Sequence, residues 1–303
     1  MLATLTCLNP RSLPAPPDGL PSRCTPPPLA LMHSHLLLSL LQPLLACSGD
    51  TAGERVVTKS GMVMRVIPPG SFTMGCTPGA GECFTDEKPT QAVILTVPFL
   101  LGETEVTQGQ WQAVMGSNPS HFASCGPDCP VEQVSWLDAV AFANALSETE
   151  GLESCYRVSG EAVTWPRGLA CTGYRLPTEA EWEHAARAGG DTTYAGSADI
   201  AAVVWYRDTS ERTPHPVGGK RANAWGLHDM NGNVWEWTWD AFQPFSGGGT
   251  VTDPIGPETG LERSIRGGGF GDGSRVVRLV FRRRFSPGGR GFDLGLRLAR
   301  TKH

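Results

Sequence analysis

The chain contains 303 residues, including 37 glycines, 25 prolines and nine tryptophans, and its net charge is −5. That length is sufficient for a sizeable hydrophobic core in one large domain or two small ones. The mildly acidic charge argues against nucleic-acid binding, which needs a broad basic surface. The one basic block is Arg282-Arg283-Arg284, which we interpret as strand or loop surface. Abundant glycine, proline and tryptophan favour a loop-rich fold.

The first 47 residues have the composition of a targeting sequence. Residues 1–31 are too rich in proline to build a packed element. Residues 36–47 are apolar, but the stretch is too short, and too interrupted by Gln42 and Pro43, to span a bilayer. It ends in Leu44-Leu-Ala-Cys47, which is similar to a bacterial lipobox, where the cysteine is lipidated and becomes the mature N-terminus.

We therefore expect a proline-rich leader and signal peptide over residues 1–47, with lipidation at Cys47 and Met32 as a candidate start. An ordinary secretory signal cleaved nearby is the alternative. Both interpretations predict an extracytoplasmic protein, in the periplasm or at the cell surface, and lipidation would add a membrane anchor. A short polar tether is predicted over residues 48–60 and the folded domain over residues 61–303.

The first part of the domain predicts strands and one short helix. Apolar and polar residues alternate from Met62, turn at Pro68-Pro-Gly70 and resume, which is typical of strand–turn–strand. The β-branched content of residues 92–97 predicts a buried strand. Residues 107–115 predict a short helix with Thr107 as its N-cap.

Two capping boxes predict longer helices further along. Ser135-Trp-Leu-Asp138 is a capping-box variant that opens a helix through about Leu146. Thr178-Glu-Ala-Glu181 follows Pro177 and opens a helix that Gly189-Gly190 would end. The acids Glu179, Glu181 and Glu183 suit the helix dipole and cap better than acid–base catalysis. No long periodic helix follows, so we expect a single irregular α+β domain.

Six cysteines remain beyond Cys47, and an even count on an exported domain predicts disulfide bonds. Several connectivities are open, and we favour local pairing. A zinc site is the rival interpretation, but the sequence lacks CxxC pairs and histidines at ligand spacing. The favoured pairs are Cys76–Cys83, Cys125–Cys129 and Cys155–Cys171.

Seven short motifs are spread over about residues 62–300. They are Phe72-Thr-Met-Gly75, Glu103-Thr-Glu-Val-Thr107, Pro130-Val131 with Val134-Ser-Trp-Leu-Asp-Ala139, Tyr174-Arg-Leu-Pro-Thr-Glu-Ala-Glu-Trp-Glu183, Pro216-Val-Gly218, Gly226-Leu-His-Asp-Met-Asn-Gly-Asn-Val-Trp-Glu-Trp237 and Arg266-Gly-Gly268. Each motif alone is weak, but together and in this order they resemble the formylglycine-generating enzyme (sulfatase-modifying factor) family. The resemblance implies that family's compact, loop-rich α+β fold with little regular secondary structure, which is related to C-type lectin-like domains.

The resemblance supports the family's fold but does not extend to the residues of its copper chemistry. Family enzymes oxidise a sulfatase cysteine to formylglycine with oxygen, using two cysteines just after the Arg-Gly-Gly element to bind Cu(I). In this chain those positions fall near Asp272 and Val277, and residues 266–285 contain no cysteine. Soft thiolates suit Cu(I), whereas carboxylate and aliphatic groups do not. Copper is therefore not expected, no catalytic residue is assigned, and enzymatic activity stays an open question.

The family pattern also implies a calcium site in the tryptophan-rich motif. Asp229 and Glu236 would supply side-chain oxygens, and Gly232 and Val234 would supply carbonyl oxygens, which suit Ca²⁺. The alternative is a turn anchored by tryptophan in which Asp229 caps its own backbone. A second family calcium site is not carried over, because residues 202–205 have valine where asparagine is expected.

By the same resemblance, a charged cleft should lie where family enzymes bind peptide. We expect a binding or accessory domain for a peptide or protein partner, or for a small polar ligand. An oxidative enzyme for protein or metabolite maturation is the alternative, and authentic formylglycine generation is the third hypothesis. The residues predicted to frame the cleft are Trp235, Arg266, Asp272, Arg275, Arg278 and Arg297.

Overall fold

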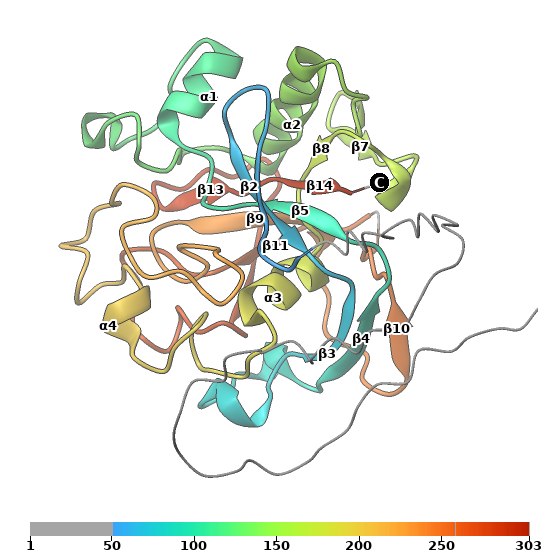
Figure 1. The fold of residues 1–303 in the computed structure, drawn as a ribbon, viewed down its shortest axis with the longest axis vertical. Coiled ribbons are helices and arrows are strands. Elements are labelled where there is room, and N and C mark those ends of the chain that lie inside the picture. Colours follow the sequence, from blue (N-terminus) through green and yellow to red (C-terminus); the bar gives the residue numbers. More distant parts are fainter. Residues whose placement is uncertain (1–50, 258, 303) are drawn as a thin grey trace, which may run out of the picture. The chain divides into compact units, whose positions relative to one another are not determined.

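The computed structural model describes residues 51–257 and 259–302, all of which belong to one compact unit. The predicted leader, the signal peptide and Cys47 lie outside the described residues. Among the helices that the structure describes, none is long and apolar enough to cross a membrane. Strands in the described ranges form four sheets, connected by extensive loops (Figure 1).

The largest sheet joins segments that are far apart in the sequence. Its order is β1-β2-β5-β14-β8, and every neighbouring pair is antiparallel. Because β1 pairs with β2, residues 55–57 belong to the fold, and the predicted tether over residues 48–60 is wrong in that part. The strands are β1 (Arg55–Val57), β2 (Val63–Ile67), β5 (Phe99–Gly102), β8 (Tyr174–Arg175) and β14 (Ala299–Thr301).

A three-stranded sheet, β10-β4-β3, comprises β3 (Gly70–Met74), β4 (Gln91–Leu95) and β10 (Thr250–Thr252). The predicted strand–turn–strand is present, but β2 and β3 pair in different sheets, so the prolines mark a change of sheet. Strand β4 alternates between buried and exposed residues, and Ile94 is 38% exposed. The prediction of a buried strand there holds only for alternate residues, because one face of this sheet is open to solvent.

The third sheet carries the tryptophan-rich strand at its centre. Its order is β12-β11-β9-β13, and every residue of β9 is buried. The arginine run lies in the edge strand β12, where Arg282 is buried while Arg283 and Arg284 are exposed, so its prediction as surface holds only in part. The strands are β9 (Trp235–Ala241), β11 (Arg263–Arg266), β12 (Arg282–Phe285) and β13 (Leu294–Leu296); β6 (Arg157–Ser159) and β7 (Ala162–Thr164) form a separate hairpin.

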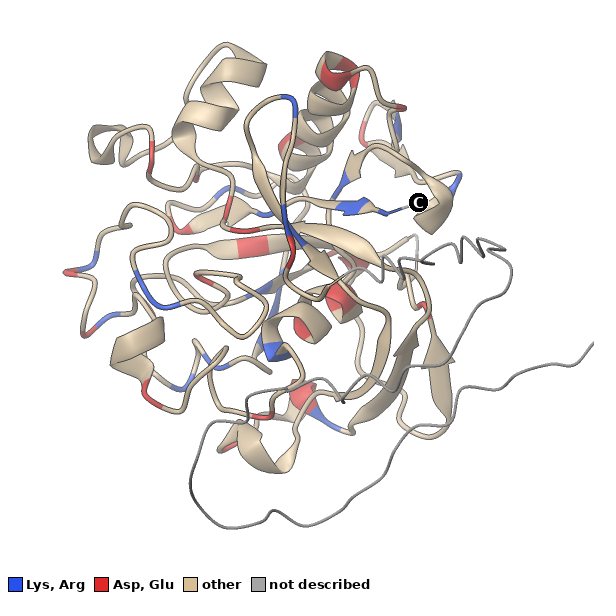
Figure 2. Cartoon of the chain, viewed as in Figure 1, with Lys and Arg blue, Asp and Glu red and all other residues tan. Residues whose placement is uncertain are grey.

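The three predicted helices are confirmed, although two of them end at residues other than those predicted. The helices are α1 (Gln108–Met115), α2 (Trp136–Glu150), α3 (Glu179–Arg187) and the single turn α4 (Ile200–Val203). Thr107, Ser135 and Thr178 each cap a helix through a complete capping box. Helix α2 continues past Leu146, and α3 ends at Ala188 in the left-handed region rather than at the glycine pair. Helix α3 contacts β3, β9 and β11, and it carries charges of both signs (Figure 2).

Aromatic rings fill the core beside β9. The ring of Trp239 stacks on Tyr156 with centroids 5.0 Å apart and meets Trp165 edge-on at 5.3 Å. Such pairs contribute about 0.5–1.5 kcal/mol beyond the area they bury. The three predicted disulfide bonds are all present and close local loops: Cys76–Cys83, Cys125–Cys129 and Cys155–Cys171.

Candidate functional site

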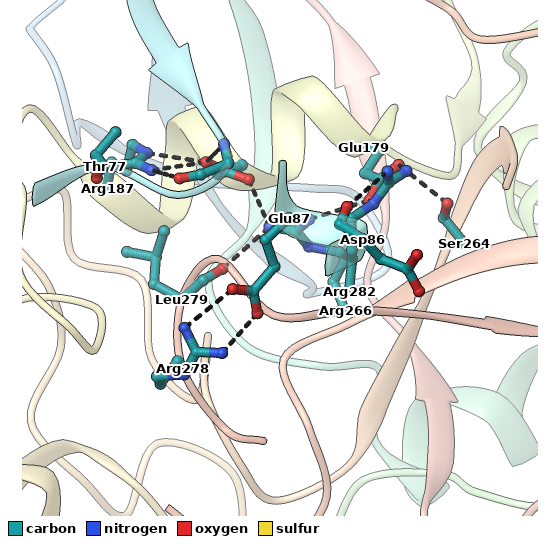
Figure 3. A network of polar contacts seen from close by, with 12 residues as sticks. Thr77, Asp86, Glu87, Glu179, Arg187, Ser264, Arg266, Arg278, Leu279 and Arg282 are labelled. Atoms are coloured by element: carbon teal, nitrogen blue, oxygen red, sulfur yellow. Dashed lines mark hydrogen bonds and ion pairs between the residues drawn. The ribbon is translucent and has the colours of Figure 1, made fainter. Parts of the chain in front are cut away.

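Helix α3 presents two buried glutamates to arginines from distant segments. Glu179 accepts hydrogen bonds from Arg266 Nη1 at 3.0 Å and from Arg282 Nη2 at 2.6 Å. Glu183, one turn further on, accepts from Arg266 Nη2 at 2.7 Å and from Arg187 Nη2 at 2.8 Å. Figure 3 shows Glu179 facing Arg266 and Arg282. The network therefore ties α3 to β11 and β12.

The electrostatics of this network keep its members charged. Burial alone would raise the pKa of the Glu179 carboxyl, but the guanidinium groups of Arg282 and Arg266 hold it below its usual value. The carboxylates of Glu183 and Glu179 likewise raise the pKa of Arg266 despite its burial. Removing one partner would leave an uncompensated buried charge, which typically costs about 3–5 kcal/mol.

A separate buried pair joins Glu87 to Arg278. Arg278 Nη2 donates to Glu87 Oε1 at 2.5 Å, and both residues are at most 3% exposed (Figure 3). Arg266 is completely buried in the network above. The prediction that Arg266 and Arg278 line a ligand cleft is therefore wrong, because carboxylates inside the domain occupy their guanidinium groups.

Arg297 is also buried, against Glu236 of β9. Arg297 Nη2 donates to Glu236 Oε1 at 2.7 Å, and Trp182 Nε1 donates to Glu236 Oε2 at 2.7 Å. The guanidinium also reaches the carbonyl oxygens of Gly102 and His228, each at 2.8 Å. With 0% of its surface exposed, Arg297 cannot contact a ligand in a cleft, and that prediction is wrong as well.

The four predicted calcium ligands differ in how free their oxygens are. The carboxylate of Glu236 is engaged by Arg297 and Trp182, as described above. Asp229 Oδ2 accepts from Gly218 N at 2.6 Å, whereas its Oδ1 is buried and has no partner among the described residues. Gly232 and Val234 lie buried in the turn that leads into β9.

Glu105 is a further buried residue with a carboxyl group near Asp229. Neither of its side-chain oxygens has a hydrogen-bond partner in the described ranges. Burial, followed by the nearby Asp229 carboxylate, raises the pKa of Glu105 well above its ordinary value, and burial raises the pKa of Asp229. Two such carboxyls require a proton or a cation, because an uncompensated buried charge is costly.

The fit to calcium is therefore partial. Glu105 and Asp229 offer the free oxygens that a hard cation prefers, whereas Glu236 does not. No group of three or more histidine, cysteine, aspartate or glutamate side chains within the described residues is placed to hold a metal ion. Any cation here would depend on two carboxylates supplemented by backbone oxygens.

The two family cysteine positions have different surroundings. Asp272 is half-buried, and its Oδ2 accepts from Trp235 Nε1 and from Gly269 N, each at 2.9 Å. Val277 is fully buried. All six cysteines that the structure describes form disulfide bonds, so none of them offers a free thiol near Asp272.

Two surface hollows share Arg283 beside these residues. One has a volume of about 280 Å³ and includes Trp235, Asp293 and Phe292 in its lining. The other has a volume of about 470 Å³ and includes Asp272. Burial, and then the Asp272 carboxylate, raises the pKa of Asp293, so the two acids interact electrostatically. The linings also include Asp86, Glu262, Arg282, Arg284 and Arg290, so the two acids lie on a surface of mixed charge beside an aromatic ring.

The structure thus brings Trp235 and Asp272 together and separates the predicted arginines from them. Arg275 is exposed, but it points to Glu82, whose Oε1 lies 2.8 Å from Arg275 Nη2. Sequence reasoning missed Asp293, Arg283 and Glu105. Glu105 lies within the family motif Glu103–Thr107, so its place in that motif was the available signal, whereas Asp293 and Arg283 lie in none of the seven family motifs.

The fold and these motifs define a domain of the sulfatase-modifying-factor class. Residues 50–302 match the sulfatase-modifying factor enzyme 1-like domain, and the chain belongs to that family. The resemblance and the fold class inferred from the sequence are thereby confirmed.

Three relatives show how similarity is distributed within the family. The chain is 32% identical to the chaperone protein LppX of Paenibacillus barcinonensis over 300 residues, covering 88% of this chain and 98% of that protein. It is 32% identical to the formylglycine-generating enzyme of Streptomyces coelicolor over 246 residues, covering 67% and 77%. Treponema denticola variable protein 1 superposes with a TM-score of 0.72 at 34% identity, covering 82% of this chain and 99% of that one.

Proposed function

We propose that this protein is an exported accessory protein that binds a peptide segment through a basic group in the hollows beside Trp235. The observation that carries the proposal is the pair of half-buried carboxylates, Asp272 and Asp293, which interact with each other at the same surface. Opposite charge lowers the cost of keeping both acids ionised. A lysine or arginine side chain would supply that charge, while Phe292, which is 52% exposed, would contact its apolar stem.

The atoms available to bind a metal at this surface favour peptide binding over copper-dependent oxidation. Asp272 carries oxygen ligands where family enzymes carry sulfur, and the described cysteines are all oxidised. The similarity to a protein named a chaperone extends over most of this chain and supports an accessory role. An enzyme for oxidative maturation is the alternative, supported by the similarity to a formylglycine-generating enzyme.

Three disulfide bonds in one domain favour an oxidising, extracytoplasmic compartment. A lipid anchor at Cys47 is the finer proposal. Metabolic labelling with a palmitate analogue in a bacterial host would test it, with Cys47→Ser as the matched variant. Labelling of the variant at the wild-type level would contradict the anchor.

A structural calcium ion is a further part of the proposal. Glu105 and Asp229 would hold it, since their oxygens are the free ones, and Glu236 would stay paired with Arg297. The ion would neutralise the buried acids and stiffen the turn that leads into β9.

Calorimetric titration would test peptide binding. The probes are a capped peptide, Gly-Gly-Lys-Gly-Gly, and the same peptide with norleucine in place of lysine. We expect the lysine peptide to bind at least tenfold more tightly, and Asp293→Asn to remove most of that difference. Glu82→Gln, outside the hollows, should retain it. Equal binding of both peptides would contradict the proposal, and copper-dependent oxygen consumption with a cysteine peptide would favour the enzyme alternative.

A further inference from the structure

A further cavity lies between the three-stranded sheet and the start of α3, and Arg282 lines both this cavity and the hollow that includes Asp272. Its volume is about 200 Å³. The sheet β10-β4-β3 supplies one side, the first turn of α3 and the end of β9 another, and the loops after β9 and β10 the remainder. The apolar residues that line it include Met74, Val93, Ala180, Phe245, Val251 and Pro254.

Most buried polar side chains around this cavity are already engaged. Glu179 and Arg282 bind each other, with Nε to Oε1 at 2.8 Å. Gln91 Nε2 donates to the carbonyl of Gly249 at 2.7 Å, and Gln91 Oε1 accepts from Ser246 Oγ at 3.2 Å. These groups shape the wall but have little capacity left for a ligand.

Asp240 is different. Its Oδ2 accepts from Glu179 N at 2.6 Å, but within the described part of the chain its Oδ1 accepts no hydrogen bond. The residue is only 7% exposed. A Cβ at position 256 would lie 2.7 Å from Oδ1, so Gly256 keeps this carboxylate uncovered. A buried carboxylate oxygen therefore faces a largely apolar cavity.

We propose that this cavity is a binding site for a small apolar ammonium ion, with Asp240 Oδ1 accepting a hydrogen bond from the ammonium group and the hydrocarbon lying among Val93, Phe245 and Val251. An ammonium group matches one free acceptor in an apolar wall, because the ion pair is charge-assisted and the alkyl chain gains from leaving water. A carboxylate ligand is disfavoured, because the free Oδ1 of Asp240 would repel it.

The charged groups around Asp240 permit this binding to depend on pH. Glu179 and Glu181 lie on α3, and Arg282 and Arg263 come from the neighbouring strands. Burial, followed by Glu179, raises the pKa of Asp240 to about 7. An alkylammonium ion stays protonated well above that pH. Affinity should therefore rise about tenfold between pH 6 and pH 8, as Asp240 ionises.

The test uses the full domain with n-butylammonium as the probe and n-butanol as its neutral counterpart. Binding is followed by NMR shifts of the Ala180 and Val251 methyl groups, which separates this cavity from the surface hollows. We expect saturable shifts with n-butylammonium that strengthen with pH, and at least tenfold weaker binding of n-butanol.

Two variants examine the site independently. Asp240→Asn should weaken n-butylammonium at least tenfold and abolish the pH dependence, and Val251→Phe should fill the cavity and remove binding while Asp240 stays intact. Asp208→Asn, whose side chain is 61% exposed, is the matched control and should bind as wild type. The proposal is overturned if wild type gives no saturable shift, if n-butanol binds equally, or if both cavity variants bind as wild type.

Discussion

The indole Nε1 of Trp235 lies 2.9 Å from Oδ2 of Asp272, so a tryptophan in a buried strand orients a carboxylate on a surface loop. Trp235 is 2% exposed, and its backbone is fixed by pairing within the sheet. The carboxylate therefore has a defined position before any partner arrives. Preorganisation of this kind reduces the ordering cost of binding.

Replacing this tryptophan tests the arrangement directly. Trp235→Phe should keep the fold while weakening binding of the lysine peptide about tenfold, because a hydrogen bond to a charged group typically contributes about 1.5–3 kcal/mol. Calorimetry provides the affinity. Trp225→Phe, which removes an indole outside the hollows, is the matched control, and equal losses in both variants would contradict an orienting role.

The buried network at α3 predicts a large loss of stability when one of its carboxylates is removed. Glu183→Gln should lower the free energy of unfolding by about 3–5 kcal/mol, because Arg266 and Arg187 would lose a charged partner inside the domain. Urea denaturation followed by tryptophan fluorescence measures the change. Glu153→Gln breaks a half-exposed ion pair with Arg167 and should cost less than about 1 kcal/mol. Similar losses for the two variants would argue against the network as a stabilising element.

The raised pKa of Asp240 predicts how the stability of the protein depends on pH. Its pKa is raised to about 7 in the folded protein, from an ordinary value of 3.8. Between those values the folded protein retains a proton that the unfolded chain has lost, so the free energy of unfolding should fall as the pH rises from about 4 to 7. Asp240→Asn should flatten this slope in urea denaturation at a series of pH values. An unchanged slope would show that another group is responsible.

Calcium should affect stability through Glu105 and Asp229. At pH 8, where the unpaired acids repel each other most, we expect added Ca²⁺ to raise the melting temperature of wild type, since a ligand that binds only the folded state stabilises it. Glu105→Gln should abolish the Ca²⁺ effect and raise the melting temperature without Ca²⁺, because one buried charge is gone. Differential scanning calorimetry with Asp208→Asn as the control measures both. A Ca²⁺ effect retained in Glu105→Gln would contradict this site.

The sequence was most informative where local chemistry determines structure. The N-cap at Thr107 and the capping boxes at Ser135 and Thr178 predicted the helix starts, because a cap is specified by residues within one turn. The disulfide pairs were predictable for a similar reason, since each closes a short loop. The family motifs predicted the fold because they occur in order along the chain.

The candidate site was harder to predict, because arginine patterns do not reveal burial. Arg266, Arg278 and Arg297 looked like ligand contacts in the sequence, yet each is paired inside the domain with an acid that is distant in the sequence. Such pairing depends on tertiary packing, which brings Arg278 to Glu87 across most of the domain's length. Asp293 was missed because a single acid before a strand has no distinctive spacing.

The position of β14 has a consequence for the order of events during synthesis. Strand β14 lies between β5 and β8, so the largest sheet keeps an open seam until residues 299–301 have emerged. A ribosome or a translocation channel that still holds those residues would also hold the whole domain in an incomplete state. Closure of this sheet therefore waits for the delivery of residues 299–301.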